Sequence, residues 1–395
     1  MFSINKNSYL HNYFENMNPR LINRCVDKAR EFSNIDEHDL DPPANRLTSE
    51  QPNIPVKNVD VTRRSLGFGR KAMPKLRREL HNKDQDVVIA AIETICDLVH
   101  DPERGYEAVN LKIIDRMVNL MSHESEVIRE RTSRTLAVLA ELAAGREAIV
   151  TNKSLLANIA ACAEDTWAEI RIQVAALLEM IARFWKAADD LVQFGFIQIL
   201  LSNLLTEDSE IQIMHLQTLR SLMYETTGKI IAIESDGFNI FLKLLDEDNT
   251  QIISGALACL ALLTSTCVGE KLAREAKLLR ILNIFLHDER PEVYTNAASV
   301  IMFCTLKTQG KLDAYKVKNL PKRLIHLSRN KLNPSTQIFA IKALSNICEH
   351  PKIRTEVQKK YFEQIKNIQV GDDPCIKSYK NQLLTVIGWV ASSST

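Results

Sequence analysis

The stretch that decides the fold is IISGALACLALL, from Ile252 to Leu263, because its pattern recurs along the chain. The stretch VYTNAASVIMFC, from Val293 to Cys304, begins 41 residues later and repeats the same arrangement. Each opens on an apolar residue, has a small residue four places on, and has apolar residues eight and eleven places on. Steps of four, four and three residues place these side chains on one stripe of an α-helix.

Eight copies of this pattern can be aligned on their first residue. Successive copies begin 41, 42, 41, 41, 41, 43 and 40 residues apart, at Val87, Ile128, Ile170, Ile211, Ile252, Val293, Thr336 and Ile376. A period of about 40–47 residues is typical of armadillo and HEAT repeats. One such repeat cannot bury its apolar face alone, so neighbouring repeats stack and share a continuous core. The sequence therefore predicts an all-α fold.

The remainder of each copy favours three helices. A glycine stands 17 or 18 residues after the first residue of five copies: Gly105, Gly145, Gly228, Gly269 and Gly310. Because glycine adopts positive φ without a Cβ clash, we expect these residues to end one helix and turn the chain into the next. A short helix, a longer apolar helix (such as 196–205) and an acidic turn follow. Three helices favour the armadillo repeat over the two-helix HEAT repeat, although the two grade into each other.

The predicted architecture is a right-handed α-solenoid of about eight armadillo (HEAT-like) repeats with an extended N-terminal arm. The arm covers residues 1–62, which do not fit the period and are expected to be partly helical or disordered. The array covers 63–391, with atypical first and last copies that cap the stack, and 392–395 form a frayed tail. The arm either folds onto a partner or into the groove of the array, or remains a tail.

Composition and motifs exclude several functions. The formal net charge is +1, so no general attraction to nucleic acid is expected, and no apolar run is long enough to span a membrane. Gly67–Lys71 resembles a phosphate loop only superficially, and no hydrolase or nucleotide-binding motif occurs. Cys96, Cys259, Cys304 and Cys348 follow the repeat spacing rather than metal-site spacing, and His38 fits a solvated loop. We therefore expect a cytosolic product with no catalytic residues, cofactor or metal.

Charge is segregated along the chain. Residues 57–83 carry nine basic and two acidic residues, and residues 307–331 carry eight basic and one acidic residue. Residues 164–210 carry nine acidic and three basic residues. The basic ends could steer docking onto an acidic filament such as a microtubule surface. Alternatively, all three zones are simply solvated faces of the solenoid.

A protein-binding groove is expected along the third helix of each repeat, which is the helix that carries the aligned apolar stripe. Importin-type adaptors hold basic peptides with a tryptophan about six places and an asparagine ten places after the first residue of this pattern. In this chain only Asn346 matches. The mismatch argues against a nuclear-import receptor. The candidate groove residues are Arg134, Val138, Met180, Gln217, Ser221, Leu262, Ser299, Phe303, Lys342 and Asn346. Val138, Met180, Leu262 and Phe303 would form an apolar stripe that receives a partner helix or the chain's own arm. The alternative is that adjacent third helices cover them as ordinary core.

Three stretches carry a more specific pattern. They are FGRKAMPKL (Phe68–Leu76) with CDLVHDPE (Cys96–Glu103) and Ala108-Val109-Asn110; Asn296-Ala297-Ala298 with Met302-Phe303 and Gly310-Lys311; and AIKAL (Ala340–Leu344). In them the chain resembles the radial spoke head 14 homologues, also called the rhabdoid tumour deletion region protein family, which are armadillo proteins of motile cilia. The resemblance covers about residues 52–390. The chain departs from the family in its long arm and in Ala187 and Ile353, which replace linker glycines.

The resemblance implies a non-enzymatic structural subunit of the radial spoke. It implies other radial spoke or axonemal proteins as partners, and the axoneme of a cilium or flagellum, within cytoplasm and cytoskeleton, as the location. A soluble cytosolic adaptor or assembly factor for ciliary complexes is the alternative. Within the His-Asp-Pro-Glu segment we expect a structural role, with Asp101 capping a helix that Pro102 begins.

Overall fold

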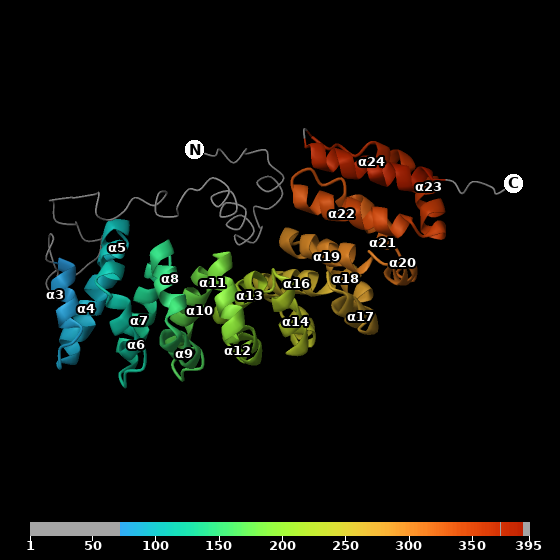
Figure 1. The fold of residues 1–395 in the computed structure, drawn as a ribbon. Coiled ribbons are helices and arrows are strands. Elements are labelled where there is room, and N and C mark those ends of the chain that lie inside the picture. The colour runs from blue at the N-terminus through green and yellow to red at the C-terminus, as the bar shows by residue number, and fades with distance from the viewer. Residues whose placement is uncertain (1–71, 372, 390–395) are drawn as a thin grey trace. The chain divides into compact units, whose positions relative to one another are not determined.

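A computed structural model describes residues 72–371 and 373–389 of the chain. Within these residues the chain forms 22 α-helices, α3 to α24, one short 3-10 helix and no strand (Figure 1). The predicted all-α fold is therefore confirmed. The predicted arm (1–62) and tail (392–395), together with His38 and Gly67–Lys71, lie outside the described residues. None of the described helices is long and apolar enough to span a membrane.

The array predicted over 63–391 divides into two compact units within the described residues, with the boundary between Leu222 and Met223. The first unit contains α3 (Ala72–Glu79), α4 (Gln85–Leu98), α5 (Pro102–Asn110), α6 (Ile113–Met121), α7 (Glu126–Leu139), α8 (Ala143–Thr151), α9 (Lys153–Cys162), α10 (Ala168–Ala182), α11 (Trp185–Phe194), α12 (Phe196–Asn203) and α13 (Ser209–Leu222). Its long third helices α4, α7, α10 and α13 pack against one another in chain order (Figure 1).

The second unit has the same order of elements up to its last repeat. It contains α14 (Thr226–Glu234), α15 (Gly237–Lys243), the 3-10 helix η3 (Leu244–Asp246), α16 (Thr250–Thr264), α17 (Cys267–Glu275), α18 (Leu278–Phe285), α19 (Pro291–Cys304), α20 (Thr308–Tyr315), α21 (Leu320–Leu327), α22 (Pro334–Cys348), α23 (Pro351–Lys366) and α24 (Pro374–Gly388). Its third helices α16, α19, α22 and α24 also pack in chain order. In the last repeat the single helix α23 replaces two short ones, so this repeat is atypical, as expected.

The predicted stripe is the core of both units. In each of the first seven copies, the residue eight places after the first one is fully buried; these residues begin with Ile95 and end with Leu344. In all eight copies, the residue eleven places after the first one is buried, beginning with Leu98 and ending with Ile387. The last copy differs by one residue, because Leu383 is fully buried whereas Leu384 is partly exposed. A change in register is physically reasonable there, since a terminal helix has a neighbour on one side only.

The linker glycines do not have the role that the sequence predicted. Only Gly195 and Gly371 have positive φ among the described glycines, and Gly145, Gly269 and Gly310 lie inside the first turns of α8, α17 and α20. A Cβ on Gly145 would overlap the carbonyl oxygen of Leu139, which ends the preceding third helix. These positions require glycine because one helix begins against the carbonyl end of the other.

Residues in the left-handed backbone region instead make the turn between the first and second helices of a repeat, which are the two helices that precede its long third helix. Lys112, Asp236, Lys277 and Asn319 have φ between 51° and 61°, and each immediately precedes a second helix. Gly195, with φ 100°, makes the same turn before α12. Asparagine and aspartate tolerate this backbone region better than most residues, whereas lysine has no such preference.

The expected cap at the His-Asp-Pro-Glu segment is confirmed. The side chain of Asp101 accepts a hydrogen bond of 3.1 Å from the backbone N–H of Glu103, and Pro102 is the first residue of α5. Proline suits this position because the first N–H groups of a helix have no intrahelical partner.

Arginine side chains clamp neighbouring repeats of the first unit. Arg129 on α7 donates to both carboxylate oxygens of Asp165 at 2.8 and 3.2 Å, and Arg171 on α10 donates to Glu207 at 2.9 and 3.0 Å. Arg129 also donates to the carbonyl oxygens of His123 and Glu124. Burial opposes ionisation of Asp165, but hydrogen bonds from Arg129 and from the backbone of Trp167 lower its pKa overall. Each arginine therefore ties a turn of its own repeat to the corresponding turn of the next.

Replacing Arg129 by alanine should lower the free energy of unfolding by about 2 kcal/mol, because it leaves a largely buried carboxylate without its charged donor. Urea denaturation measures the change, and a double-mutant cycle with Asp165→Ala isolates the pair. Lys360→Ala is the control, since it removes the exposed Lys360–Glu356 pair within α23 and should leave the free energy of unfolding almost unchanged. Equal effects of the two variants would contradict the claim that the Arg129–Asp165 pair stabilises the contact between neighbouring repeats.

Candidate protein-binding surface

The ten candidate groove residues all lie on third helices. Arg134, Val138, Met180, Gln217 and Ser221 lie on α7, α10 and α13, and Leu262, Ser299, Phe303, Lys342 and Asn346 lie on α16, α19 and α22. The first five belong to one compact unit and the last five to the other. The structure therefore brings them together as two groups rather than as one site.

Exposure divides the candidates further. Arg134 and Gln217 are exposed, whereas Val138, Met180, Leu262, Phe303, Lys342 and Asn346 are partly exposed. Ser221 and Ser299 are only 7% and 6% exposed, so they offer little surface to a partner, and their place in a binding groove stays a prediction. A serine side chain is short and reaches less far from a packed helix face than a larger side chain does.

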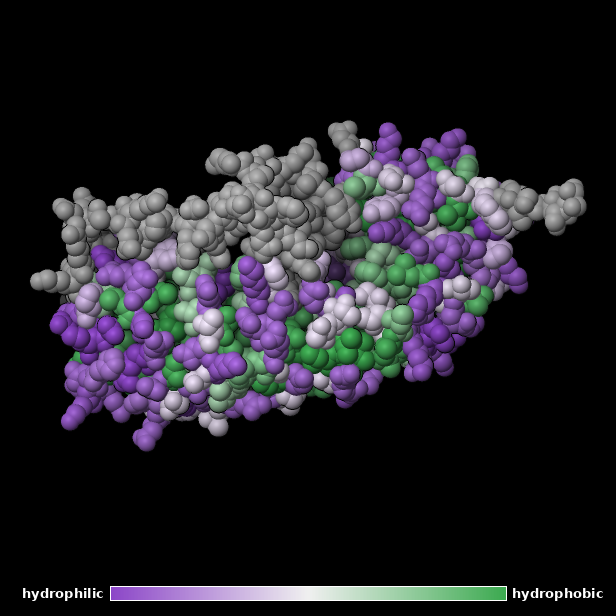
Figure 2. Space-filling model, viewed as in Figure 1, coloured by the Kyte–Doolittle hydropathy of each residue, from purple (hydrophilic) through white to green (hydrophobic). Residues whose placement is uncertain are grey.

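The four apolar candidates remain accessible in neighbouring pairs. Val138 and Met180 occupy equivalent positions on α7 and α10, and Leu262 and Phe303 do so on α16 and α19, which pack against each other. Partial exposure distinguishes them from the fully buried stripe two residues earlier on each helix. On the face shown in Figure 2, apolar residues likewise form patches among hydrophilic ones. Paired apolar positions flanked by polar side chains suit the apolar face of a partner segment.

Several polar side chains on the third helices are engaged between repeats. The side-chain amide of Asn346 donates to the carbonyl oxygen of Met302 at 3.0 Å, and that of Asn296 donates to the carbonyl oxygen of Ser254 at the same distance. The ammonium group of Lys342 lies 4.6 Å from the ring centre of Tyr379. Asn346, which matched the importin pattern, thus joins α22 to α19.

Several buried cysteines of the described residues have raised pKa values. Burial raises the pKa of Cys162 to about 11 and those of Cys304 and Cys348 to about 12, so these thiols stay protonated at neutral pH. Cys96, Cys259, Cys304 and Cys348 are all buried, as the repeat spacing suggested. Within 72–371 and 373–389, no three histidine, cysteine or acidic residues gather as metal ligands would.

Sequence reasoning missed the residues that join repeats. The signal was present, because Arg129 and Arg171 both stand one place after the first residue of a copy and each has its acidic partner 36 residues later. It also missed a cluster of basic residues around a small cavity in the second unit, because these residues come from α17, the turn before α18, α18 and the end of α20.

Solved structures similar to this chain include an engineered protein and designed armadillo repeat proteins. An engineered protein shares 20% identity with a TM-score of 0.71, over 80% of this chain and 78% of its own. A computationally designed armadillo repeat protein for modular peptide recognition shares 17% identity with a TM-score of 0.55, over 58% of this chain and 99% of its own. A designed armadillo repeat protein in complex with the peptide (KR)4 shares 17% identity with a TM-score of 0.53, over 59% and 99%.

These similarities establish the armadillo fold. No protein-family model matches the chain. An armadillo array is a fold suited to protein binding, since stacked repeats present an extended surface rather than an enclosed catalytic pocket.

Proposed function

We propose that the chain is a non-enzymatic structural scaffold of the ciliary or flagellar axoneme, a radial spoke subunit that binds other spoke proteins through its third-helix surfaces. The observation that carries the binding role is the armadillo array itself, with accessible apolar pairs on adjacent third helices. The axonemal location is supported by the resemblance of Phe68–Leu76 and Cys96–Glu103 to the radial spoke head 14 homologues.

The internal contacts suit a part that bears force. Each repeat is held by its neighbours through apolar packing, and the Arg129–Asp165 and Arg171–Glu207 pairs join successive turns of the first unit. A load along such a stack passes from repeat to repeat, and each inner repeat is held by a packed neighbour on both sides.

Contact with the microtubule surface is a further part of the proposal. In the basic segment 307–331, Lys307 pairs with Glu270 at 2.9 Å and Lys311 pairs with Glu349, so part of the positive charge is neutralised. Lys318, Lys322 and Lys331 are exposed. Exposed cations favour docking onto an acidic filament, and such docking would weaken as salt screens the charges.

The test is extraction of tagged protein from cells with motile flagella, first with detergent and then with high salt. Retention in the axoneme together with spoke subunits supports the scaffold. Complete release with the soluble fraction contradicts it and favours the cytosolic adaptor or assembly factor.

Phe303→Asp should reduce the axoneme-bound fraction at least about tenfold, because it places a charge in the apolar pair that Leu262 and Phe303 form on α16 and α19. Ile284→Asp is the matched control, since Ile284 is 72% exposed on the second helix α18. Circular dichroism must show that both variants remain folded. A folded Phe303→Asp variant that keeps every partner would remove the third-helix surface from the proposal.

A further inference from the structure

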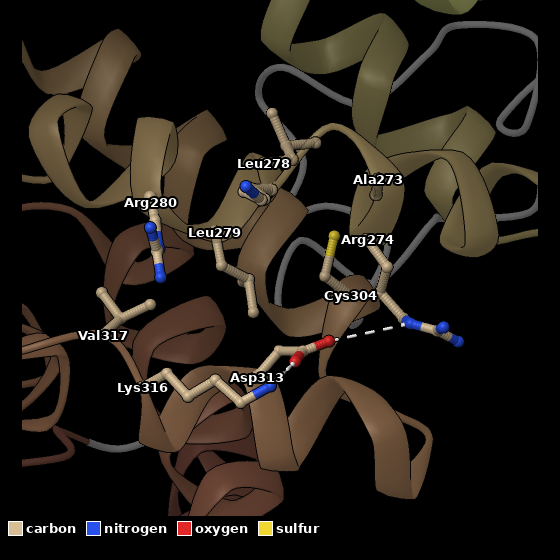
Figure 3. A pocket seen from close by; sticks show the side chains of 10 residues that line it. Ala273, Arg274, Leu278, Leu279, Arg280, Cys304, Asp313, Lys316 and Val317 are labelled. Carbon is tan, nitrogen blue, oxygen red and sulfur yellow. Dashed lines mark hydrogen bonds and ion pairs between the residues drawn. The ribbon is translucent and has the colours of Figure 1, made fainter.

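A small cavity lies within the second unit, where α17, α18, α20 and the end of α19 meet (Figure 3). Its volume is about 200 Å³, and it is lined by Ala273, Arg274, Lys277, Leu278, Leu279, Arg280, Cys304, Asp313, Lys316 and Val317. Only Cys304 comes from a third helix. The cavity is therefore distinct from the third-helix surface described above.

The floor of the cavity is apolar. Leu279 and Val317 are 7% and 8% exposed, and Cys304 is 3% exposed. In Figure 3 the side chain of Leu279 points toward Asp313 and Lys316. An apolar floor that remains in contact with solvent favours an apolar group from a partner.

The rim of the cavity is strongly basic. Arg274, Lys277, Arg280 and Lys316 contribute four positive charges against the single carboxylate of Asp313. Asp313 accepts from Lys316 at 2.7 Å and lies 3.7 Å from Arg274. Lys277 and Arg280 have no acidic partner among the described residues. Two cations beside an apolar floor are thus available to a ligand.

The local backbone structure determines the positions of Lys277 and Arg280. Lys277 adopts the left-handed conformation, with φ 51°, between α17 and α18, and Arg280 follows in the first turn of α18. The N-terminal end of a helix carries a partial positive charge from its N–H groups. This partial charge has the same sign as the two side chains, so the whole mouth of the cavity favours an anion.

The size of the cavity limits what can occupy it. Pockets for drug-sized ligands and cofactors measure about 300–1,000 Å³. A cavity of about 200 Å³ is smaller and holds about one side chain. A peptide that inserts one apolar side chain while its neighbouring carboxylates contact the rim satisfies both the floor and the charges.

We propose that this cavity is a second docking site that takes an acidic peptide segment of a partner protein, with one apolar anchor side chain flanked by carboxylates. The inference rests on the proposed protein-binding function but not on its axonemal location. Lys277 and Arg280 are the residues that select the acidic segment, and Leu279 and Val317 receive the anchor.

The test measures binding of a fluorescein-labelled peptide Glu-Asp-Leu-Asp-Glu to the purified full chain by fluorescence anisotropy. The double variant Lys277→Glu/Arg280→Glu should weaken binding at least about tenfold. Lys359→Glu/Lys366→Glu is the matched control, because it makes the same change in charge at exposed positions on α23 that do not line the cavity and lie outside the basic segment 307–331. The control should retain binding within about twofold of the unaltered chain.

The peptide controls separate an anchored peptide from a general anion site. Glu-Asp-Ser-Asp-Glu should bind at least about fivefold more weakly, because its side chain leaves the apolar floor empty. Equal binding of the leucine and serine peptides, equal loss in both protein variants, or displacement of the peptide by millimolar inorganic phosphate would overturn the proposal. Axonemal extraction of the unaltered chain decides the proposed function separately, so the two can fail independently.

Discussion

Replacing Gly310 by alanine is expected to lower the free energy of unfolding by about 3 kcal/mol, although glycine to alanine within a helix usually stabilises by about 1 kcal/mol. The new Cβ would overlap the carbonyl oxygen of Cys304 and would lie 2.9 Å from its carbonyl carbon and 3.3 Å from the Cα of Thr305. These are backbone atoms at the junction of α19 and α20, so relief requires the helices to separate. Urea denaturation followed by circular dichroism measures the change.

Two other glycines give graded controls for this prediction. A Cβ on Gly105 would meet chiefly the Cδ1 atom of the Leu142 side chain, which can rotate away, so Gly105→Ala should cost less than about 1.5 kcal/mol. A Cβ on Gly388 would meet nothing within 4 Å, so Gly388→Ala should be neutral or slightly stabilising. Stabilisation by Gly310→Ala would show that this close helix approach is wrong.

Acidification from pH 6.5 to pH 4 should destabilise the first unit by about 3 kcal/mol through His215 alone. His215 on α13 is 2% exposed, and burial, with a smaller contribution from the positive charge of Arg171, lowers its pKa from 6.5 to about 4. The folded state therefore keeps the imidazole neutral, whereas the unfolded state binds a proton below pH 6.5. The stability contributed by the neutral ring is complete above pH 6.5 and is lost as the pH falls toward 4.

The variant His215→Leu isolates this contribution from other titrating groups. The Nδ1 atom of His215 has no hydrogen-bond partner among the described residues, so leucine removes a buried polar atom without breaking a bond. We expect the variant to be at least as stable as the unaltered chain at pH 7 and to lose about 3 kcal/mol less between pH 6.5 and 4. Parallel pH profiles of the two proteins in urea denaturation would contradict the assignment.

The repeat pattern predicted the fold because it depends on local periodicity. The stripe through Ile252, Ala256, Leu260 and Leu263 specifies one buried helix face, and all four residues are buried. The period then implies stacking, and the cap at Asp101 follows from the chemistry of a single turn. Such features require only neighbouring residues in the sequence.

The features that the sequence did not predict depend on contacts between repeats. Gly310 suggested a turn, but its role comes from the approach of α20 to the carbonyl end of α19. Ser299 occupies a position expected to be accessible, yet it is only 6% exposed. The cavity beside Lys277 and Lys316 joins residues from helices about 40 residues apart, and the pattern of a single repeat does not contain that juxtaposition.

The proposed function links these contacts to a mechanical and binding role. Apolar packing holds both units together and the arginine pairs reinforce the first, while the accessible apolar pairs on the third helices and the basic cavity are the proposed separate surfaces for partners. A scaffold with more than one binding surface can position several subunits at once, since each surface engages its own partner.

The measurement that tests the central claim most directly is cryo-electron tomography of axonemes from cells that lack this chain. The account predicts that density is missing from a radial spoke and returns, with an added label, when tagged protein is supplied. Axonemes with every spoke intact and no labelled density would contradict the assignment of this armadillo protein to the spoke.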